Sequence, residues 1–418
     1  MTRICAEWLS DERLQALLAA LSASGEEARV VGGAVRNTLM ERPVTDIDIA
    51  TTTLPEETMR RAEAIGLKTV PTGIEHGTIT VVANGRPFEV TTLRRDIETD
   101  GRHAVVTFGR DWRTDAERRD FTINALYADA AGEVLDLVGG IADIEAGNLR
   151  FIGDAEQRIL EDRLRILRFF RFFAWYGRGR PDADGLRAAT RLKDGLAQLS
   201  AERLWAETKK LLAAPDPSRA LLWMRQTGAL TIVLPETERW GIDHIHPLVA
   251  SERARGWAPD PLLRLMAIVP PDPERLAGLA RRLKLSNGER DRLFAFALER
   301  QPGPDEADRA LRARVYFGDR QAIVDTLRLE LARAQGKIGQ DPDALEKTAS
   351  LAARLDIAQG FEPPAFPLSG GDLKAKGFAA GPGLGSEIAR LKQLWAETGF
   401  TMGREALLAK AGKGESDA

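Results

Sequence analysis

The spacing of apolar residues changes near residue 150, and this change constrains the fold more than any other feature of the sequence. Between residues 28 and 150, apolar and polar residues alternate over short runs such as TDIDIATT and FEVTTL, which is typical of β-strands. From about residue 155, apolar residues recur every three or four positions, as in ILEDRLRILRFFRFFAWYG and AERLWAETKKLLAA. This spacing indicates amphipathic helices. The sequence therefore predicts an α+β unit followed by an all-α region.

Several local elements are predicted inside the first part. ARVVGGAVRNTLM predicts a strand, a glycine turn and the start of a helix, and GTITVVANGRPFEVTTL predicts a hairpin that turns at Asn84 and Gly85. The run EVLDLVGGIADIEAGNLRFI is interpreted as further short strands, and residues 94–117 as a polar surface loop. The first 21 residues predict an amphipathic helix rather than a signal peptide.

Composition limits the kinds of site that the chain can build. No apolar run reaches the ~20 residues that a membrane span needs, so a cytoplasmic protein without a membrane partner is expected. The single cysteine, Cys5, excludes an internal disulfide and a cysteine-rich metal site, and only four histidines are present. A metal would therefore be held by carboxylates, which favours Mg²⁺. The net charge of −3 means that any nucleic-acid contact must use a local basic patch.

Three acidic residues in the first part are candidate metal ligands and catalytic residues. In a strand, residues two apart share a face, so Asp46 and Asp48 are expected side by side while Ile47 and Ile49 point into the core. Paired carboxylates bind hard divalent cations. Glu89 would join them if its strand lies next to theirs. Taken alone, such residues are also compatible with an ordinary solvated strand end.

Two further motifs are candidate phosphate and ribose contacts. Gly32 and Gly33 lie between a strand and a helix, where backbone N–H groups can approach a phosphate, and Arg36 lies one turn later. Neither a GKS/GKT loop nor G-x-G-x-x-G is present. In RRDFTINAL, Arg118 and Arg119 offer guanidinium groups, Asp120 can accept from a ribose hydroxyl, and Asn124 would share its face if a helix opens here.

The run EDRLRILRFFRF is a candidate for reading a nucleobase. On a helix, Asp162, Arg165 and Arg168 stay on one side, whereas Arg171 turns away from them. A carboxylate accepts from the amino group of C or A, and a guanidinium donates to a ring acceptor. An exposed ion pair on a helix is the plain structural alternative.

Together, the order GGAVR, DID, FEVTTLRRD, RRDFTINAL and EDRLRILRFFRF resembles the class II tRNA nucleotidyltransferases. That family comprises CCA-adding enzymes and the related bacterial poly(A) polymerases. The resemblance covers about residues 28–240, continues through ALLWMRQTGALTIVLPE, and reappears in FPLSGGDLKAKGFAAGPGLG near the C-terminus. Residues 240–360 are matched only by their helical pattern.

The resemblance implies roles for individual residues. It makes Asp46 and Asp48 the Mg²⁺ ligands and Glu89 the supporting carboxylate. It makes Gly33 and Arg36 bind the triphosphate, and Arg119 and Asp120 contact the phosphates and the ribose. Asp162 and Arg165 would read the base, and Arg168 and Arg171 would help to hold the nucleotide. The family usually has Asp where this chain has Asn37. An equivalent of the segment 94–117 helps the family switch from C to A addition.

The resemblance also implies the fold and the domains. It predicts a polymerase-β-like head (residues 1–150), a helical neck (151–240), a helical body (241–360) and a tail with a disordered C-terminus (361–418). The expected activity is addition of C, C and A to the 3′ end of tRNA from CTP and ATP, with no DNA partner. Addition of poly(A), of CC only or of A only shares the same motifs, and a non-catalytic RNA-binding protein is the alternative of another class. Two interpretations remain open for the basic residues from Arg275 to Arg292: contact with the phosphate backbone of tRNA, or an ordinary solvated helix face.

Overall fold

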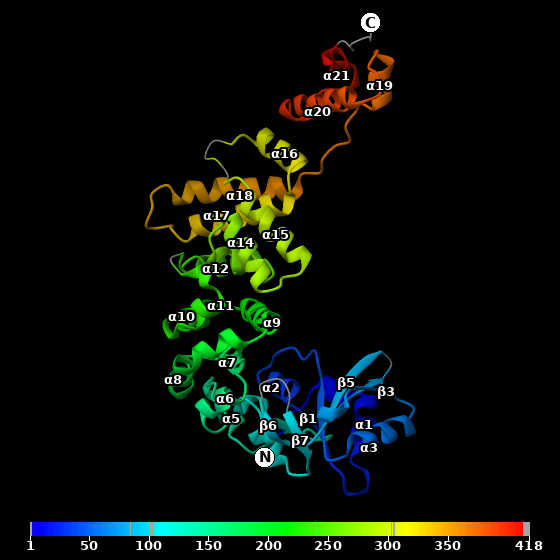
Figure 1. Ribbon diagram of the computed structural model, residues 1–418, viewed down its shortest axis with the longest axis vertical. Helices are drawn as coiled ribbons and strands as arrows, with labels where there is room; N and C mark the ends of the chain where they lie inside the picture. Colours follow the sequence, from blue (N-terminus) through cyan, green and yellow to red (C-terminus); the bar gives the residue numbers. More distant parts are fainter. Residues whose placement is uncertain are drawn as a thin grey trace. The chain divides into compact units, whose positions relative to one another are not determined.

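The computed structural model describes residues 2–83, 85–99, 104–238, 240–301, 303 and 306–412. The chain divides into two compact units, Met1–Pro235 and Glu236–Ala418 (Figure 1). The division lies close to the boundary predicted at residue 240, and the finer division into head, neck, body and tail stays a prediction. Asn84 of the predicted turn and residues 413–418 of the predicted disordered tail lie outside the described residues.

The α+β expectation is confirmed by the first unit, whose main sheet has seven strands in the order β3-β4-β5-β2-β1-β8-β9. β2 pairs with β5 in parallel, and the other neighbours are antiparallel. The strands are β1 (Ala28–Val31), β2 (Asp48–Thr51), β3 (Lys68–Gly73), β4 (Thr78–Ala83), β5 (Arg86–Thr92), β8 (Leu126–Ala128) and β9 (Val134–Asp136). A separate hairpin is formed by β6 (Arg94–Thr99) and β7 (Ala104–Phe108).

Alternation along the central strands gives the sheet one buried face. Ile49, Val90 and Ile79 are register neighbours on β2, β5 and β4, and all three are fully buried. Helices α1 (Glu12–Leu21) and α3 (Pro55–Ala64) pack on the sheet. Because side chains alternate along a strand, the residues next to these in sequence point to the opposite face. That is the face to which Asp48 and Glu89 belong.

The helices of the first unit follow the predicted change of pattern. Helix α7 (Arg165–Tyr176) has an apolar side built from Ile166, Phe169, Phe170 and Phe173, all of them buried. The remaining helices of this unit are α2 (Gly33–Leu39), α4 (Trp112–Glu117), α5 (Gly140–Ala146), α6 (Ala155–Glu161), α8 (Ala183–Leu192), α9 (Ala201–Leu212), α10 (Ser218–Thr227) and α11 (Ala229–Val233).

The strand interpretation of GIADIEAG is wrong, because these residues form helix α5. The Asp136 carboxylate accepts hydrogen bonds from the backbone N–H groups of Val138, Gly139, Gly140 and Ile141, which caps the start of the helix. Gly147, in the left-handed region at φ 69°, ends it. The signal was present as Asp136 before two glycines and as the three-residue spacing of Ile141 and Ile144, which is typical of a helix.

The segment 94–117 is also more regular than the predicted surface loop. Its described residues form the hairpin β6–β7 and helix α4, which Asp111 caps through the N–H groups of Arg113 and Thr114. The N-terminal helix is confirmed as α1, but the residues before it are not part of that helix. Ile4 donates its backbone N–H to Gly132 at 2.9 Å, so the first residues pair with the β8–β9 turn.

The second unit is all-α, as the sequence predicts. The segment 361–369, inside the predicted linker 360–371, has no helix or strand. The helices are α12 (Ile245–Arg255), α13 (Pro261–Ile268), α14 (Pro273–Arg282), α15 (Asn287–Leu298), α16 (Asp308–Phe317), α17 (Arg320–Gln335), α18 (Ala344–Gly360), α19 (Gly370–Ala375), α20 (Pro382–Glu397) and α21 (Arg404–Lys410). In the described part of the chain, no helix combines the length and apolar character that a membrane crossing requires.

A buried ion pair lies between α12 and α13. Arg264, 1% exposed, donates from Nη2 to Glu252, 3% exposed, at 2.6 Å. Burial raises the pKa of Glu252, although Arg264 opposes this rise. The carboxylate therefore depends on its partner for its charge.

The substitution Arg264→Met should destabilise the second unit by about 3–5 kcal/mol, because it leaves Glu252 buried without its cation. Urea unfolding followed by circular dichroism measures the loss. The matched control is Arg290→Met, whose partner Asp291 is exposed, so its cost should stay below about 1 kcal/mol. Equal losses for the two variants would contradict this view of the pair.

Candidate active site

In the glycine turn between β1 and α2, Gly32 has a backbone conformation that favours glycine over any other residue. Gly32 has φ 69° and ψ −112°, a region that side-chain-bearing residues avoid. Its N–H donates to the Leu126 carbonyl of β8 at 2.9 Å. A Cβ on Gly32 would lie 3.4 Å from the Asn124 carbonyl oxygen. Gly33 is the first residue of α2, where the backbone is helical and the turn opens towards the surface.

The acidic residues come together at one end of β2. Asp48 is the first residue of β2 and is the register partner of Glu89 on β5, so the predicted neighbourhood of these two residues is confirmed. Ile47 and Ile49 are buried, as alternation predicts. Asp46, however, lies before the strand, in an exposed segment without regular structure. The strand that was predicted to carry both aspartates therefore contains only Asp48.

Electrostatics couple the three carboxylates. Desolvation by the surrounding protein raises the pKa of Asp48, and the negative charges of Glu89 and Asp46 raise it further, whereas Arg119 lowers it. Concentrated negative charge of this kind, presented by oxygen donors, fits a hard divalent cation. Within the described ranges, no three acidic, histidine or cysteine side chains gather closely enough to hold a metal by themselves. A cation here would take its other ligands from water and substrate phosphates, as Mg²⁺ commonly does.

RRDFTINAL forms a single 3₁₀ turn, Thr122–Asn124, rather than an α-helix. Asn124 nevertheless meets Asp120, donating from Nδ2 to Oδ1 at 2.9 Å. Arg168 of α7 donates to the other carboxylate oxygen, with Nε at 2.7 Å. Burial opposes ionisation of Asp120, but Arg168 and Asn124 hold its pKa below the ordinary value. Asp120 therefore joins the loop after α4 to helix α7.

A buried carboxylate orients the two arginines before Asp120. Asp115, 1% exposed, pairs with Arg118 at 2.6 Å and with Arg119 at 3.1 Å. Arg119 also donates from Nε to the Tyr127 hydroxyl at 3.2 Å. Its Nη1 lies 3.9 Å from the point that a Cβ on Gly32 would occupy. The Arg119 guanidinium therefore presents one edge to the glycine turn.

The single helix predicted for EDRLRILRFFRF is wrong, because the chain breaks at Asp162. Asp162 has extended backbone angles after α6, and its Oδ1 accepts the N–H of Leu164, just before α7 begins. Arg165 donates to Glu161 at 2.6 Å. The partner of Asp162 is instead Arg203 of α9, whose Nη2 donates to Oδ2 at 2.7 Å. A carboxylate and a guanidinium are therefore paired here, but the guanidinium comes from a different helix.

One cavity of about 480 Å³ in the first unit brings these groups together. Six arginines and three aspartates contribute to its wall, so cationic groups outnumber carboxylates and an anionic ligand fits. The lining consists of Gly32, Gly33, Arg36, Asp48, Arg118, Arg119, Asp120, Asn124, Asp162, Leu164, Arg165, Arg168, Phe172 and Arg203. Asp46, Glu89 and Arg171 do not line it, and Arg171 instead pairs with Glu207 of α9 at 2.6 Å.

The sequence analysis missed Arg203, Glu207, Asp115 and Tyr176. Arg203 and Glu207 lie four residues apart in AERLWAETKK, which was interpreted only as an amphipathic helix. The signal was an acid and a base one turn apart on the same side of an amphipathic helix. Glu207 is buried beside Arg168 and Arg171, so it neutralises a pair of arginines that would otherwise repel each other.

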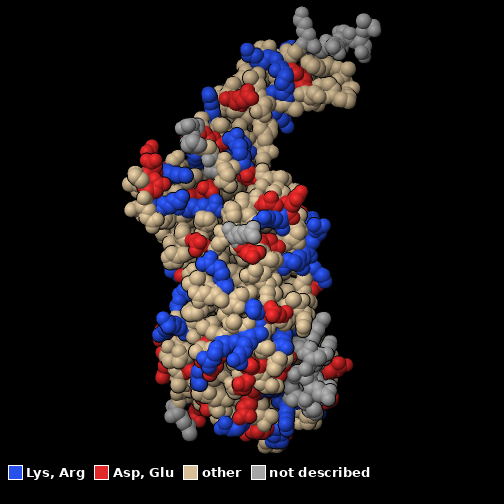
Figure 2. All heavy atoms as spheres, turned by 60° about the vertical axis from the view of Figure 1, so that its left-hand side comes forward, with Lys and Arg blue, Asp and Glu red and all other residues tan. Residues whose placement is uncertain are grey.

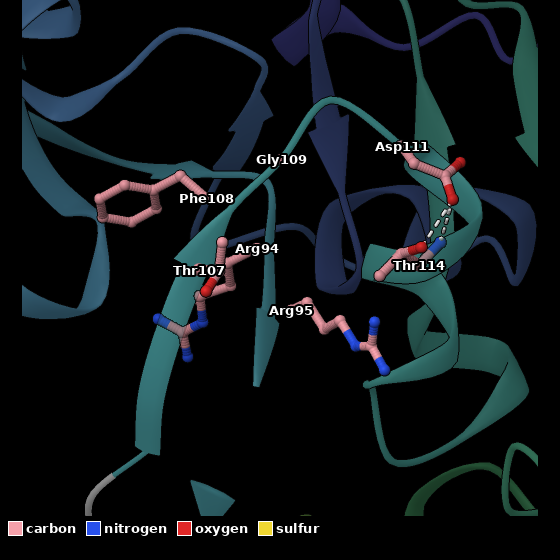
Figure 3. Close-up of a pocket in the computed structure, with 7 residues that line it drawn as sticks. All are labelled: Arg94, Arg95, Thr107, Phe108, Gly109, Asp111 and Thr114. Atoms are coloured by element: carbon pink, nitrogen blue, oxygen red, sulfur yellow. Dashed lines mark hydrogen bonds between the residues drawn. The ribbon is translucent and has the colours of Figure 1, made fainter. Parts of the chain in front are cut away.

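A second cavity, of about 550 Å³, lies beside the β6–β7 hairpin (Figure 3). It does not carry the same chemistry. Asp111 is engaged in capping α4, where it accepts from the N–H and the hydroxyl of Thr114. Arg94 donates to the His76 carbonyl, and the Phe108 ring points away from Arg95 in Figure 3. The cavity that contains Asp48 is therefore the better candidate for an active site.

Comparisons with known proteins identify the family to which the chain belongs. The sequence matches the family described as "Poly A polymerase head domain" over residues 28–150, and "Probable RNA and SrmB- binding site of polymerase A" over residues 181–240. The crystal structure of a Bacillus stearothermophilus CCA-adding enzyme in complex with CTP is similar over 96% of both chains, with 27% identity and a TM-score of 0.70. Fold and site together define a nucleotidyltransferase.

The relatives narrow the class further. The mouse mitochondrial CCA tRNA nucleotidyltransferase 1 is 32% identical over 96% of this chain and 90% of its own length. A CCA-adding enzyme of Leuconostoc mesenteroides is 31% identical over 90% of each chain. The chain belongs to the CCA-adding enzyme family of tRNA nucleotidyltransferases, and the resemblance inferred from the motifs is confirmed.

The two glycines of the turn should respond differently to alanine. Gly32→Ala forces a side chain into a strained region and should cost about 1–3 kcal/mol of stability. Gly33→Ala is the matched control, because it lies in a helix and the nearest atom to its new Cβ is 3.8 Å away. It should leave stability unchanged within about 1 kcal/mol. Thermal unfolding of both variants measures this, and equal losses would contradict the assignment of strain to Gly32.

Proposed function

We propose that the chain adds C, C and A to the 3′ end of tRNA, using CTP and ATP and releasing pyrophosphate. The observation that carries this proposal is the single cavity that joins Asp48 and the glycine turn to Asp162. One end of the cavity has the groups for a triphosphate and a metal, and the other end has a carboxylate and a guanidinium suited to a base edge. The family relatives named above carry the same activity in their names.

The reaction forms one P–O bond and breaks another. The RNA 3′ oxygen attacks the α-phosphorus of the nucleotide, the bond between that phosphorus and the bridging oxygen breaks, and pyrophosphate leaves. Asp46 and Asp48 are the proposed ligands of Mg²⁺, with Glu89 as the supporting acid. When bound, a divalent cation lowers the pKa of an attacking hydroxyl and neutralises charge on the phosphate. The chain's own residues position the RNA 3′ oxygen and the nucleotide for this reaction.

The remaining roles follow from where each group faces. Gly33 opens the turn to close approach by phosphate, and Arg119 presents a guanidinium edge beside it. Asp120 and Asn124 are proposed to hold the ribose side of the nucleotide, with Arg168 fixing the Asp120 carboxylate. Asp162 keeps unused lone pairs for the amino group of C or A. Arg165 and Arg203 both line that end of the cavity and supply N–H donors.

The match to a poly(A) polymerase head domain keeps one second candidate open. Poly(A) addition would use the same cavity and chemistry. The two activities differ in the products formed from a tRNA that lacks its CCA end: CCA addition stops after three nucleotides and requires CTP, whereas a poly(A) polymerase extends with ATP alone.

Contacts to tRNA outside the cavity require local basic groups. On the face drawn in Figure 2, Lys and Arg side chains are interleaved with Asp and Glu. Within the basic stretch from Arg275 to Arg292, several arginines are already neutralised by acids. Arg292, for example, pairs with both Asp260 and Asp325. This supports the solvated-face interpretation for much of the stretch.

We place the activity in the cytoplasm, although the named mouse relative is mitochondrial.

Asp48→Asn keeps the size of the side chain but removes its charge. Incorporation of CMP into a tRNA that lacks its CCA end should fall at least ~1,000-fold, which corresponds to about 4 kcal/mol of transition-state stabilisation. The wild-type rate should likewise collapse when EDTA removes divalent cations and return with added Mg²⁺.

The control is Asp184→Asn, an exposed aspartate of α8 that pairs with Arg187, one helical turn away. It should retain wild-type activity. Near-wild-type incorporation by a folded Asp48→Asn variant would remove the catalytic assignment.

A further inference from the structure

Arg36, the arginine of the glycine-turn motif, has every guanidinium nitrogen already engaged. Nε and Nη2 donate to the Asn37 side-chain oxygen at 3.2 and 3.0 Å. Nη1 donates to the Asn124 side-chain oxygen, and Nη2 also donates to the Tyr176 hydroxyl at 2.8 Å. Only 7% of Arg36 is exposed. Its guanidinium therefore forms part of the cavity wall rather than a mobile group that could reach out to a ligand.

The charge of Arg36 has no carboxylate partner in this wall. Among the residues that the structure describes, Arg36 forms no ion pair, and the acceptors around it are amide and hydroxyl oxygens. Burial lowers its pKa, so the protein environment disfavours the cation. Aromatic faces compensate in part, since the guanidinium carbon lies 4.2 Å from the Tyr176 ring centre and 5.3 Å from that of Phe172.

Tyr176 is the last residue of α7, so its contact with Arg36 joins that helix to α2. The same helix reaches the other side of the cavity through Arg168 and Asp120. The contacts close into a ring: Arg36 to Asn124, Asn124 to Asp120, Asp120 to Arg168, and α7 back through Tyr176 to Arg36. A closed ring of this kind fixes the glycine turn relative to the helix that carries Arg165 and Arg168.

We propose that Tyr176 is a positioning residue for nucleotide binding, which holds Arg36 in place because Asn37 supplies no negative charge. Asn37 accepts from Arg36 and Tyr176 with one neutral oxygen, while its Nδ2 donates to the Pro43 carbonyl at 2.9 Å. The Tyr176 hydroxyl adds an acceptor and its ring adds a cation-binding face. With both, the Arg36 cation stays oriented beside Gly33 and its charge remains available to a triphosphate.

This inference rests on the proposed function, and its experiment separates orientation from packing. Tyr176→Phe removes the hydroxyl but keeps the ring, whereas Tyr176→Leu removes both. We expect Tyr176→Phe to raise the KM for CTP and for ATP about 5- to 10-fold with little change in kcat. Tyr176→Leu should raise it further. Tyr316→Phe, in the second unit, is the matched control and should leave KM unchanged.

The decisive experiment asks whether a negative charge at position 37 compensates for the loss of the Tyr176 hydroxyl. Asn37→Asp gives Arg36 an ion-pair partner, so adding Tyr176→Phe in the Asn37→Asp background should raise KM less than about 2-fold. A double-mutant cycle corrects for the loss of the bond to Pro43. Equal effects of Tyr176→Phe in both backgrounds would overturn the proposal. So would an unchanged KM, or a loss confined to thermal stability.

Calorimetric titration of CTP in the presence of Mg²⁺ keeps the two proposals distinguishable. A wild-type protein that binds CTP but fails to extend tRNA would contradict the proposed activity alone. The affinity of Tyr176→Phe for CTP would still test the role of Tyr176. An affinity equal to wild type would overturn that role even if tRNA extension were normal.

Discussion

The ion pair between Asp120 and Arg168 holds the two sides of the cavity together. Asp120 lies in the loop that leads into β8, and Arg168 lies on α7, so the pair joins the sheet to the first long helix after it. Asp120 is buried whereas the Arg168 side chain is partly exposed, so breaking the pair would leave the buried carboxylate without its cation. The carboxylates of β2 and β5 belong to the sheet, and the base-reading candidates belong to the segment around α7. This contact keeps the two sides together, so that Asp48 and Asp162 line one cavity.

Sequence patterns predicted those features that depend on local periodicity. Ile47 and Ile49 are buried because alternation turns them to the face opposite Asp48, and the register of β2 with β5 then places Asp48 beside Glu89. The prediction was wrong where a capping side chain sets the bounds of a helix. Asp136 caps α5 in a segment that was interpreted as short strands, and Asp162 ends a helix that apolar spacing would continue.

Partners that lie far apart in the sequence could not be predicted from it. The pairing of Asp162 with Arg203 depends on how α9 packs against α7, and that of Arg36 with Tyr176 depends on where the end of α7 meets α2. Arg165, the expected partner of Asp162, is held by Glu161, one helical turn away. Residue types and spacing therefore predicted most of the groups that line the cavity, but they missed Arg203 and included Arg171, which lies outside the wall. The tertiary structure determines which groups act in pairs.

The central claim is that one nucleotide spans the cavity from the glycine turn to Asp162. A crystal structure of the protein with CTP and Mg²⁺ tests it most directly. We expect the triphosphate beside Gly33 and Arg119, the metal on Asp46 and Asp48, and the cytosine amino group within hydrogen-bonding distance of the Asp162 carboxylate. A nucleotide bound elsewhere, such as the cavity beside the β6–β7 hairpin, or with its base directed away from Asp162, would contradict the account.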